Sequence, residues 1–236
     1  MTKLIVRTAL LTLLTCFTSL LSKAQIGYDY ARYDVGASLG FNQFYGDVST
    51  STGTKAVSFN FNYNQSPFLN YIFEAQFGKL AGGSAVNDPL GRQFSTDYQY
   101  YAFRIQLQAG EIIDYSQSPA ANALKNLYIG TGVGILYNKI SSINRYSVQY
   151  LGYYTPGLDK SNEAFIPIRF GYEFKIFNQY LRPDIKIDLA YQYNVVFSDE
   201  LDGFKAGHLN DAYSQFTIGV KFSLGEVTSY RKQIHY

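Results

Sequence analysis

Residues 185–197 read IKIDLAYQYNVVF, and this stretch decides the fold. Every odd-numbered position in it is apolar or aromatic, from Ile185 to Phe197, whereas the even-numbered positions begin with Lys186 and Asp188. A period of two places alternate side chains on opposite faces of a β-strand. The stretch therefore predicts a strand with one apolar face and one polar face.

Seven further stretches alternate in the same way. They are residues 33–41, 57–63, 71–77, 101–109, 127–137, 166–176 and 216–224. Over all eight stretches, the 42 positions of the apolar face hold no charged residue, whereas the 34 positions of the opposite face hold nine. The eight stretches therefore predict strands that share one uncharged face.

The composition of the two faces indicates which one points outward. The polar face is mainly Gly, Ser, Asn, Gln and Ala with scattered charges of both signs, which suits a confined interior better than the Lys- and Glu-rich surface of a soluble barrel. The apolar face carries bulky aliphatic residues with Tyr and Phe near the strand ends, as in a lipid-facing band between aromatic girdles. We predict an all-β fold, an eight-stranded antiparallel transmembrane up-and-down β-barrel with a polar, side-chain-filled interior. Its expected location is the outer membrane of a Gram-negative bacterium.

Composition excludes several other classes of protein. The 236 residues are 17% aromatic and 16% charged, against roughly 25% charged in ordinary soluble domains. One Cys and two His are too few for a disulfide scaffold or a thiolate metal site. The net charge of +2 gives no electrostatic footprint for a nucleic-acid partner.

The N-terminus has the pattern of a secretory signal peptide. Residues 1–24 combine the cations Lys3 and Arg7 with an apolar run over 9–21 and a small-residue cleavage site before Gln25. A lipoprotein would use Cys16, but the preceding Thr15 suits lipobox cleavage poorly. We therefore expect a signal peptide at 1–24, a barrel at 25–224 and a short periplasmic tail at 225–236.

The connections between the stretches differ in length, which orients the barrel. Outer-membrane barrels keep short turns on the periplasmic side and longer loops outside. With a periplasmic N-terminus, the predicted outer loops are 42–56, 78–100, 138–165 and 198–215, and the predicted turns are 64–70, 110–126 and 177–184. The long turn 110–126 is an irregularity, and a short helix from Pro119 to Lys125 is expected in it.

The inward-facing charges are the first candidate site. They are Asp34, Glu74, Arg104, Arg169, Glu173, Lys175, Lys186, Asp188 and Lys221. Five are cationic and four anionic, so we predict a salt-bridged interior network instead of an ion-selective pore. A narrow solute conduit is the alternative. Gly130, Gly132 and Gly134 fall in mid-strand with no helix after them, so interior packing is expected there and not a nucleotide loop.

The last outer loop carries a second group of titratable residues. It holds Asp199, Glu200, Asp202, His208 and Asp211. A solvated loop is the first interpretation, with weak divalent-ion binding and a catalytic centre as alternatives, and the spacing matches no EF-hand or zinc pattern. With neither His on a predicted strand, no Ser/His/Asp arrangement can be assembled. We therefore expect no catalytic residue, no metal site and no cofactor, and we predict that the protein is not an enzyme.

The last predicted strand resembles the C-terminal strand signal that the barrel-assembly machinery reads. The matching residues are Thr217, Gly219, Val220, Phe222 and Leu224. The barrel-assembly machinery is therefore an expected partner during biogenesis, together with the lipid bilayer and the lipopolysaccharide of the outer membrane.

Two segments resemble small outer-membrane barrels of the Bacteroidota. Residues 34–48, DVGASLGFNQFYGDV, are similar to their opening strand and its Tyr-x-Gly-Asp turn, and residues 77–83, FGKLAGG, lead to a loop with Arg92 as in PorG-like barrels of the type IX secretion system. This resemblance to eight-stranded barrels of the OmpA–OmpW type implies a scaffold or accessory subunit of a secretion or uptake machine. It also implies contact surfaces for outer-membrane or periplasmic proteins at 110–126 and 225–236.

Two other functions stay open. Four tyrosines of an outer loop offer a possible extracellular contact for binding or adhesion: Tyr146, Tyr150, Tyr153 and Tyr154. A narrow OmpW-like channel would admit small or apolar solutes through a lateral opening. Thr131 is the one clear polar residue on the outward face, and it is the candidate place for such an opening.

Overall fold

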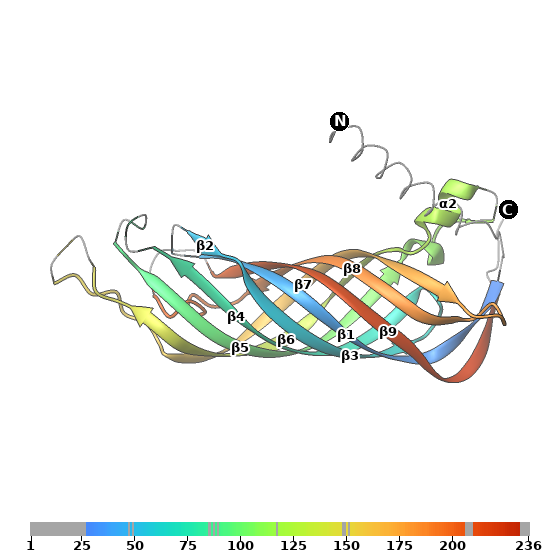
Figure 1. The fold of residues 1–236 in the computed structure, drawn as a ribbon, viewed down its shortest axis with the longest axis horizontal. Coiled ribbons are helices and arrows are strands. Elements are labelled where there is room, and N and C mark those ends of the chain that lie inside the picture. Colours follow the sequence, from blue (N-terminus) through green and yellow to red (C-terminus); the bar gives the residue numbers. More distant parts are fainter. Residues whose placement is uncertain are drawn as a thin grey trace, which may run out of the picture.

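The alternating stretches form the strands of one antiparallel sheet in the computed structural model of the chain (Figure 1). The structure describes residues 27–46, 48, 50–84, 86, 88, 90–116, 118–147, 150, 152–205 and 210–231. The predicted signal peptide lies outside them. The strands are β1 (Gly27–Tyr45), β2 (Ser51–Thr52), β3 (Thr54–Asn64), β4 (Leu69–Gly83), β5 (Gln93–Gln108), β6 (Leu127–Asn144), β7 (Lys160–Phe177), β8 (Pro183–Val196) and β9 (Ala212–Arg231).

Eight of these strands close into a ring. Pairing runs β1–β3–β4–β5–β6–β7–β8–β9, and β9 pairs back onto β1. The two-residue β2 pairs with the end of β4 and is not one of the eight strands of the ring. Closure leaves no unpaired edge among these eight strands, as a strand-built membrane span requires. The predicted eight-stranded antiparallel barrel is confirmed.

The seam between β1 and β9 is longer than the alternating stretches indicate. It runs from Tyr45 opposite Ala212 to Gly27 opposite Arg231, with a register shift between Ala31 and Tyr33. Residues 225–231, expected as part of a periplasmic tail, therefore belong to β9. They extend the strand because the start of β1 offers backbone groups that pair with them.

The hairpins at the outer end also continue past the predicted strand ends. β4 and β5 stay paired up to Gly83 opposite Gln93, and β6 runs to Asn144. The connections predicted at 78–100 and 138–165 are therefore shortened to 84–92 and 145–159. Alternation of apolar residues could not reveal these extensions, because an outward face above the lipid is polar.

The two ends of the barrel carry different connections (Figure 1). The start of β1, the end of β9 and the short connections 65–68 and 178–182 lie at one end, with the 3₁₀ helix η1 (Ala109–Glu111) and the helix α2 (Pro119–Leu124). The connections 84–92, 145–159 and 197–211 lie at the other. The helix expected from Pro119 is confirmed.

The side chain of Ser118 caps α2 by accepting a hydrogen bond from the Ala121 amide. No helix within the described residues is long and apolar enough to cross a membrane.

The two faces of the sheet differ in exposure as the alternation predicts. Leu39 and Phe59 on the outward face are 56% and 55% exposed, whereas Asp34 and Glu74 on the inward face are each 1% exposed. The apolar face is therefore the outside of the barrel, and most of the polar side chains lie within it.

Candidate functional site

The outside of the barrel is an apolar belt edged by aromatic rings. Four rings from neighbouring strands lie side by side toward the end with the termini: the centroid distances are 5.8 Å for Tyr33–Tyr63, 6.2 Å for Tyr63–Tyr71 and 6.2 Å for Tyr71–Phe103. From Tyr63 to Lys55, β3 rises by roughly 20 Å at about 3.3 Å per residue and a tilt of about 40°. This height is close to the apolar band of about 25 Å in outer-membrane barrels. The exterior is that of an outer-membrane barrel.

The structure places all nine inward charges inside the barrel and connects seven of them in a chain that alternates in sign. In order, the chain is Arg104, Glu74, Arg169, Asp188, Lys221, Glu173 and Lys175. The other two form a separate pair, with Lys186 Nζ 2.6 Å from Asp34 Oδ2. Each of these nine charges therefore faces an opposite charge, which burial requires.

Arg169 joins opposite walls of the barrel. Its Nη2 lies 2.7 Å from Asp188 Oδ2 on the neighbouring strand, and its Nη1 lies 3.9 Å from Glu74 Oε2. Glu74 is on β4, which does not pair with β7, so this second contact crosses the lumen. Arg104 Nη2 lies 2.5 Å from the same Glu74 oxygen, and the Tyr128 hydroxyl donates to Asp188 Oδ1 at 2.8 Å.

The last members of this chain of ion pairs lie toward the end of the barrel that carries η1 and α2, which is the predicted periplasmic end. Lys221 Nζ lies 2.7 Å from Glu173 Oε2. Lys175 Nζ donates to Gln108 Oε1 and to the carbonyl oxygen of Pro67, both at 2.7 Å. Pro67 belongs to the β3–β4 turn, so the network is anchored to a connection as well as to the strands.

Neutral side chains cross the lumen above the charges. The amides of Gln76 on β4 and Gln215 on β9 exchange two hydrogen bonds of 2.9 Å. Asn42 on β1 donates to the Tyr98 hydroxyl on β5 at 2.9 Å. The barrel is thus bridged at several heights by paired polar groups.

The outer part of the interior holds an apolar cluster, and most of its members lie outside the alternating stretches. Its buried members are Phe44, Ala56, Leu80, Phe94, Tyr98, Tyr100, Ala102, Leu136, Phe165, Val196, Leu201, Phe204 and Tyr213. Tyr100 and Phe165 have ring centroids 5.0 Å apart. A Cβ on Gly134 would lie 2.4 Å from the Phe165 ring, so the glycine makes room for it. One signal in the sequence could have indicated this cluster. Every second residue of β5 points inward, and this alternation continues from Ala102 to Tyr100 and Tyr98.

The β8–β9 connection folds into the outer mouth. Leu201 and Phe204 are fully buried. Asn138 Nδ2 donates to the carbonyl oxygens of Glu200 and Leu201 at 3.1 and 3.2 Å, and Arg145 Nη2 donates to that of Gly203 at 3.1 Å. The inserted segment is therefore held by its backbone and by two apolar side chains.

The acidic residues of this connection were expected in a solvated loop, and that expectation is wrong for Asp202 and Asp211, which are buried. The cause is the insertion of the loop, since Asp211 Oδ2 accepts from the Leu201 amide at 2.8 Å and Asp202 Oδ1 from the Phe204 amide at 2.9 Å. Burial, together with the charge of Asp202, raises the pKa of Asp211 to about 9. Within the described residues no group of His, Cys, Asp and Glu is arranged to hold a metal ion. His208 lies outside them.

At the predicted periplasmic end, an aromatic cluster packs over the barrel. Phe68 is fully buried, with its ring centroid 5.5 Å from that of Tyr115 and 5.8 Å from that of Tyr230. Lys125 Nζ lies 4.9 Å from the Tyr115 ring centroid, and burial lowers the pKa of Lys125 to about 8. The connection 109–126 and the end of β9 are therefore packed against the same turn.

The remaining predicted residues lie on surfaces. Tyr146, Tyr150, Tyr153 and Tyr154 are 65%, 62%, 51% and 48% exposed, and the rings of Tyr146 and Tyr154 lie 5.2 Å apart. The residues that resemble the assembly signal lie on β9, the strand that closes the ring. Val220, Phe222 and Leu224 point outward, and Thr217 and Gly219 point inward.

Comparisons with known proteins give structural likenesses only. No family model matches the chain, and no curated protein matches it. Among solved structures, neisserial surface protein A is 12% identical over 84% of this chain and 99% of its own, with a TM-score of 0.49. Ail, the attachment invasion locus protein of Yersinia pestis, is 13% identical over 83% and 99%, with a TM-score of 0.41. The outer membrane protein OprG of Pseudomonas aeruginosa is 10% identical over 88% and 99%, with a TM-score of 0.39.

Proposed function

We propose that this chain is a non-enzymatic integral outer-membrane barrel that acts as a scaffold or accessory subunit of a larger outer-membrane assembly. The observation that carries the proposal is the filled interior. Arg169 ties β7 to Glu74 across the lumen, and the β8–β9 connection inserts Leu201 and Phe204 into the outer mouth. A barrel whose interior is occupied in this way acts through its surfaces.

The interior network supports a structural role for its charges. A catalytic acid or base must reach a substrate proton within hydrogen-bond distance. Asp188 and Glu173 are instead occupied by Arg169, Tyr128 and Lys221 at 2.7–2.8 Å, below a mouth filled by apolar side chains. These carboxylates hold the barrel walls together.

Three surfaces are available for partners. The exposed tyrosines of the 145–159 connection project from the outer end, and the packed connection 109–126 and the end of β9 form the periplasmic end. Tyr is favoured at protein interfaces because it combines a large apolar area with a hydroxyl group. The resemblance to PorG-like barrels makes a type IX secretion machine the first assembly to examine.

Affinity isolation of the tagged full chain from cross-linked native membranes tests the proposal. We expect other outer-membrane or periplasmic proteins in stoichiometric amounts. The double change Tyr146→Ser and Tyr150→Ser should remove a partner bound at the outer end, whereas Tyr180→Ser, at an exposed site of the β7–β8 turn, should remove none from that end. Recovery of the barrel alone at native expression would overturn the scaffold proposal.

A narrow channel with a lateral opening is the second candidate, and one feature of the wall favours it. The β6–β7 ladder pairs Thr131 with Ile168 and resumes only at Gly134 opposite Phe165. Pro167 lies in this interval and has no N–H group for the ladder. If the wall opens here, vesicles containing the protein should take up small apolar solutes faster than empty vesicles, and a disulfide placed across the interval should abolish the difference.

A further inference from the structure

Five charged residues lie in one row across the outside of the barrel near its outer end. Lys79 is opposite Asp97, Asp97 is opposite Lys139, and Lys139 is opposite Lys160, on four successive strands. Lys55 lies beside Lys79 at the next step of the β3–β4 ladder, after the pair of Ala56 and Gly78. The sequence scatters these residues over more than 100 positions, and only the register brings them together.

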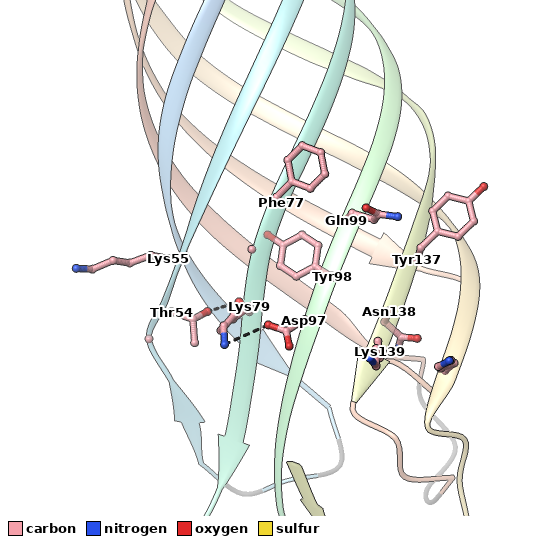
Figure 2. A pocket seen from close by; sticks show the side chains of 13 residues that line it. Thr54, Lys55, Phe77, Lys79, Asp97, Tyr98, Gln99, Tyr137, Asn138 and Lys139 are labelled. Atoms are coloured by element: carbon pink, nitrogen blue, oxygen red, sulfur yellow. Dashed lines mark hydrogen bonds and ion pairs between the residues drawn. The ribbon is translucent and has the colours of Figure 1, made fainter. Parts of the chain in front are cut away.

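The row borders the apolar belt. On β4 the outward residue before Lys79 is Phe77, and on β6 the outward residue before Lys139 is Tyr137. These side chains line one open pocket of about 1080 Å³ on the barrel surface, which Figure 2 shows from close by. The pocket therefore has the rings of Phe77 and Tyr137 toward the membrane, with Gln99 between them, and a cationic side toward the outer end.

The charges of the row do not balance among themselves. One of the four lysines is matched by Asp97, whose Oδ1 lies 3.2 Å from Lys79 Nζ. The nearby cation Arg145 is already paired with Asp159, at 2.7 Å from Nη1 to Oδ1. Lys139 and Lys160 are directly opposite each other, an arrangement of like charges that destabilises a strand pair. An anion bound between them would remove this repulsion.

We propose that Lys55, Lys79, Lys139 and Lys160 form a binding site for the phosphate groups of a phosphorylated glycolipid in the outer leaflet of the membrane. The inference rests on the membrane orientation of the proposed function, in which this end faces outward. A lipid satisfies both sides of the pocket, because its phosphates meet the ammonium groups while its acyl chains lie on Phe77 and the belt. A soluble anion would use the cationic side alone.

Titration of the purified full chain with bisphosphorylated lipid A, followed by native mass spectrometry, tests this proposal. The same lipid without phosphates is the matched probe. We expect the phosphorylated lipid to bind more tightly, and each Lys→Gln change at Lys139 or Lys160 to weaken it roughly fivefold. Arg32→Gln removes one exposed cation near the start of β1, at the opposite end of the barrel, and should leave the affinity unchanged.

Folding of each variant is checked by electrophoretic mobility without heating, and the Lys139→Gln and Lys160→Gln changes are tested separately, so that one serves if the other does not fold. Equal binding of the two lipids, or unaltered affinity in the folded Lys variants, would overturn the proposal. If inorganic phosphate in modest excess displaces the bound lipid A, the site binds a soluble anion, and the proposal of a lipid ligand is overturned. Each of these results is independent of whether partner proteins co-purify, so failure here and failure of the scaffold proposal are distinguishable.

Discussion

Arg169 and Asp188 face each other inside the barrel, with Nη2 of the arginine 2.7 Å from Oδ2 of the aspartate. The same guanidinium group donates to Gln192 Oε1 at 3.1 Å and to Thr217 Oγ1 at 2.8 Å. Arg169 thus binds side chains of β8 and β9 and approaches Glu74 of β4. Its Nε also donates to the Tyr128 hydroxyl on β6 at 3.1 Å, so this one side chain contacts four other strands of the barrel wall.

Arg169→Met should lower the free energy of unfolding by about 3–5 kcal/mol, because it removes the cation nearest to the buried Asp188 carboxylate, at 2.7 Å. Urea unfolding in lipid vesicles, followed by far-UV circular dichroism, measures the loss. Arg182→Met is the matched control: Arg182 pairs with Asp184 at 2.8 Å in a partly exposed turn, and its loss should cost about 0–1 kcal/mol. Equal midpoints for the two variants would mean that the interior pair is not what stabilises the barrel.

Phe68→Ala should loosen the periplasmic end. The ring is fully buried against Tyr115 and Tyr230, and removing a buried phenyl group costs about 3–5 kcal/mol. We expect faster protease cleavage within 109–126 in the variant, measured by mass spectrometry of the fragments. Tyr180→Ala, at a 76% exposed position of the same end, should cleave at the wild-type rate. Protection of 109–126 in both variants would show that Phe68 does not hold this connection.

The inserted β8–β9 connection should be less stable at high pH. The unfolded pKa of an aspartate is about 3.9, and burial raises the folded pKa of Asp211 to about 9. The folded state therefore binds the extra proton, so stability is fully present below pH ~4 and is lost as pH rises toward ~9. Hydrogen exchange of the Leu201 amide, corrected for its intrinsic pH dependence, should show more frequent opening at pH 8 than at pH 5.

Asp211→Asn supplies the control for this pH effect. The amide keeps an acceptor for the Leu201 N–H, which in the wild type bonds to the Asp211 carboxyl group at 2.8 Å, and it has no acidic proton to lose in this pH range. Opening in this variant should be independent of pH over the same range. A pH dependence equal to that of the wild type would assign the effect to another group.

The outward face could be predicted from the sequence because the two faces of each strand meet different surroundings. Lipid favours apolar side chains at one set of alternate positions, and the lumen favours polar side chains at the other. Leu39 and Asp34 are on the faces that their chemistry indicates, and the nine inward charges are all inside. The ion-pair partners could not be predicted, because Arg169 meets Glu74 across a lumen whose dimensions depend on the closed ring. The alternation of residues indicates which face of the sheet a side chain lies on, but it does not indicate which residue the side chain contacts.

Three further features were not predictable for a related reason. The Lys row depends on the register of five strands, and Lys139 and Lys160 become neighbours only through one hairpin. Insertion of Leu201 and Phe204 depends on space at the mouth of the barrel. The extension of β9 to Arg231 depends on the start of β1, which is about 200 residues away in sequence. In each case the feature is determined by contacts between segments that are distant in sequence, and the local residue pattern does not indicate them.

Conductance of the purified full chain in planar bilayers tests the filled interior most directly. The wild type should show no steady channels, because Leu201 and Phe204 fill the outer mouth and ion pairs bridge the lumen below. The double change Leu201→Ala and Phe204→Ala, folded by the same electrophoretic criterion, should show brief openings at most. Steady ion conduction by the wild type would contradict the account and would make the barrel a channel.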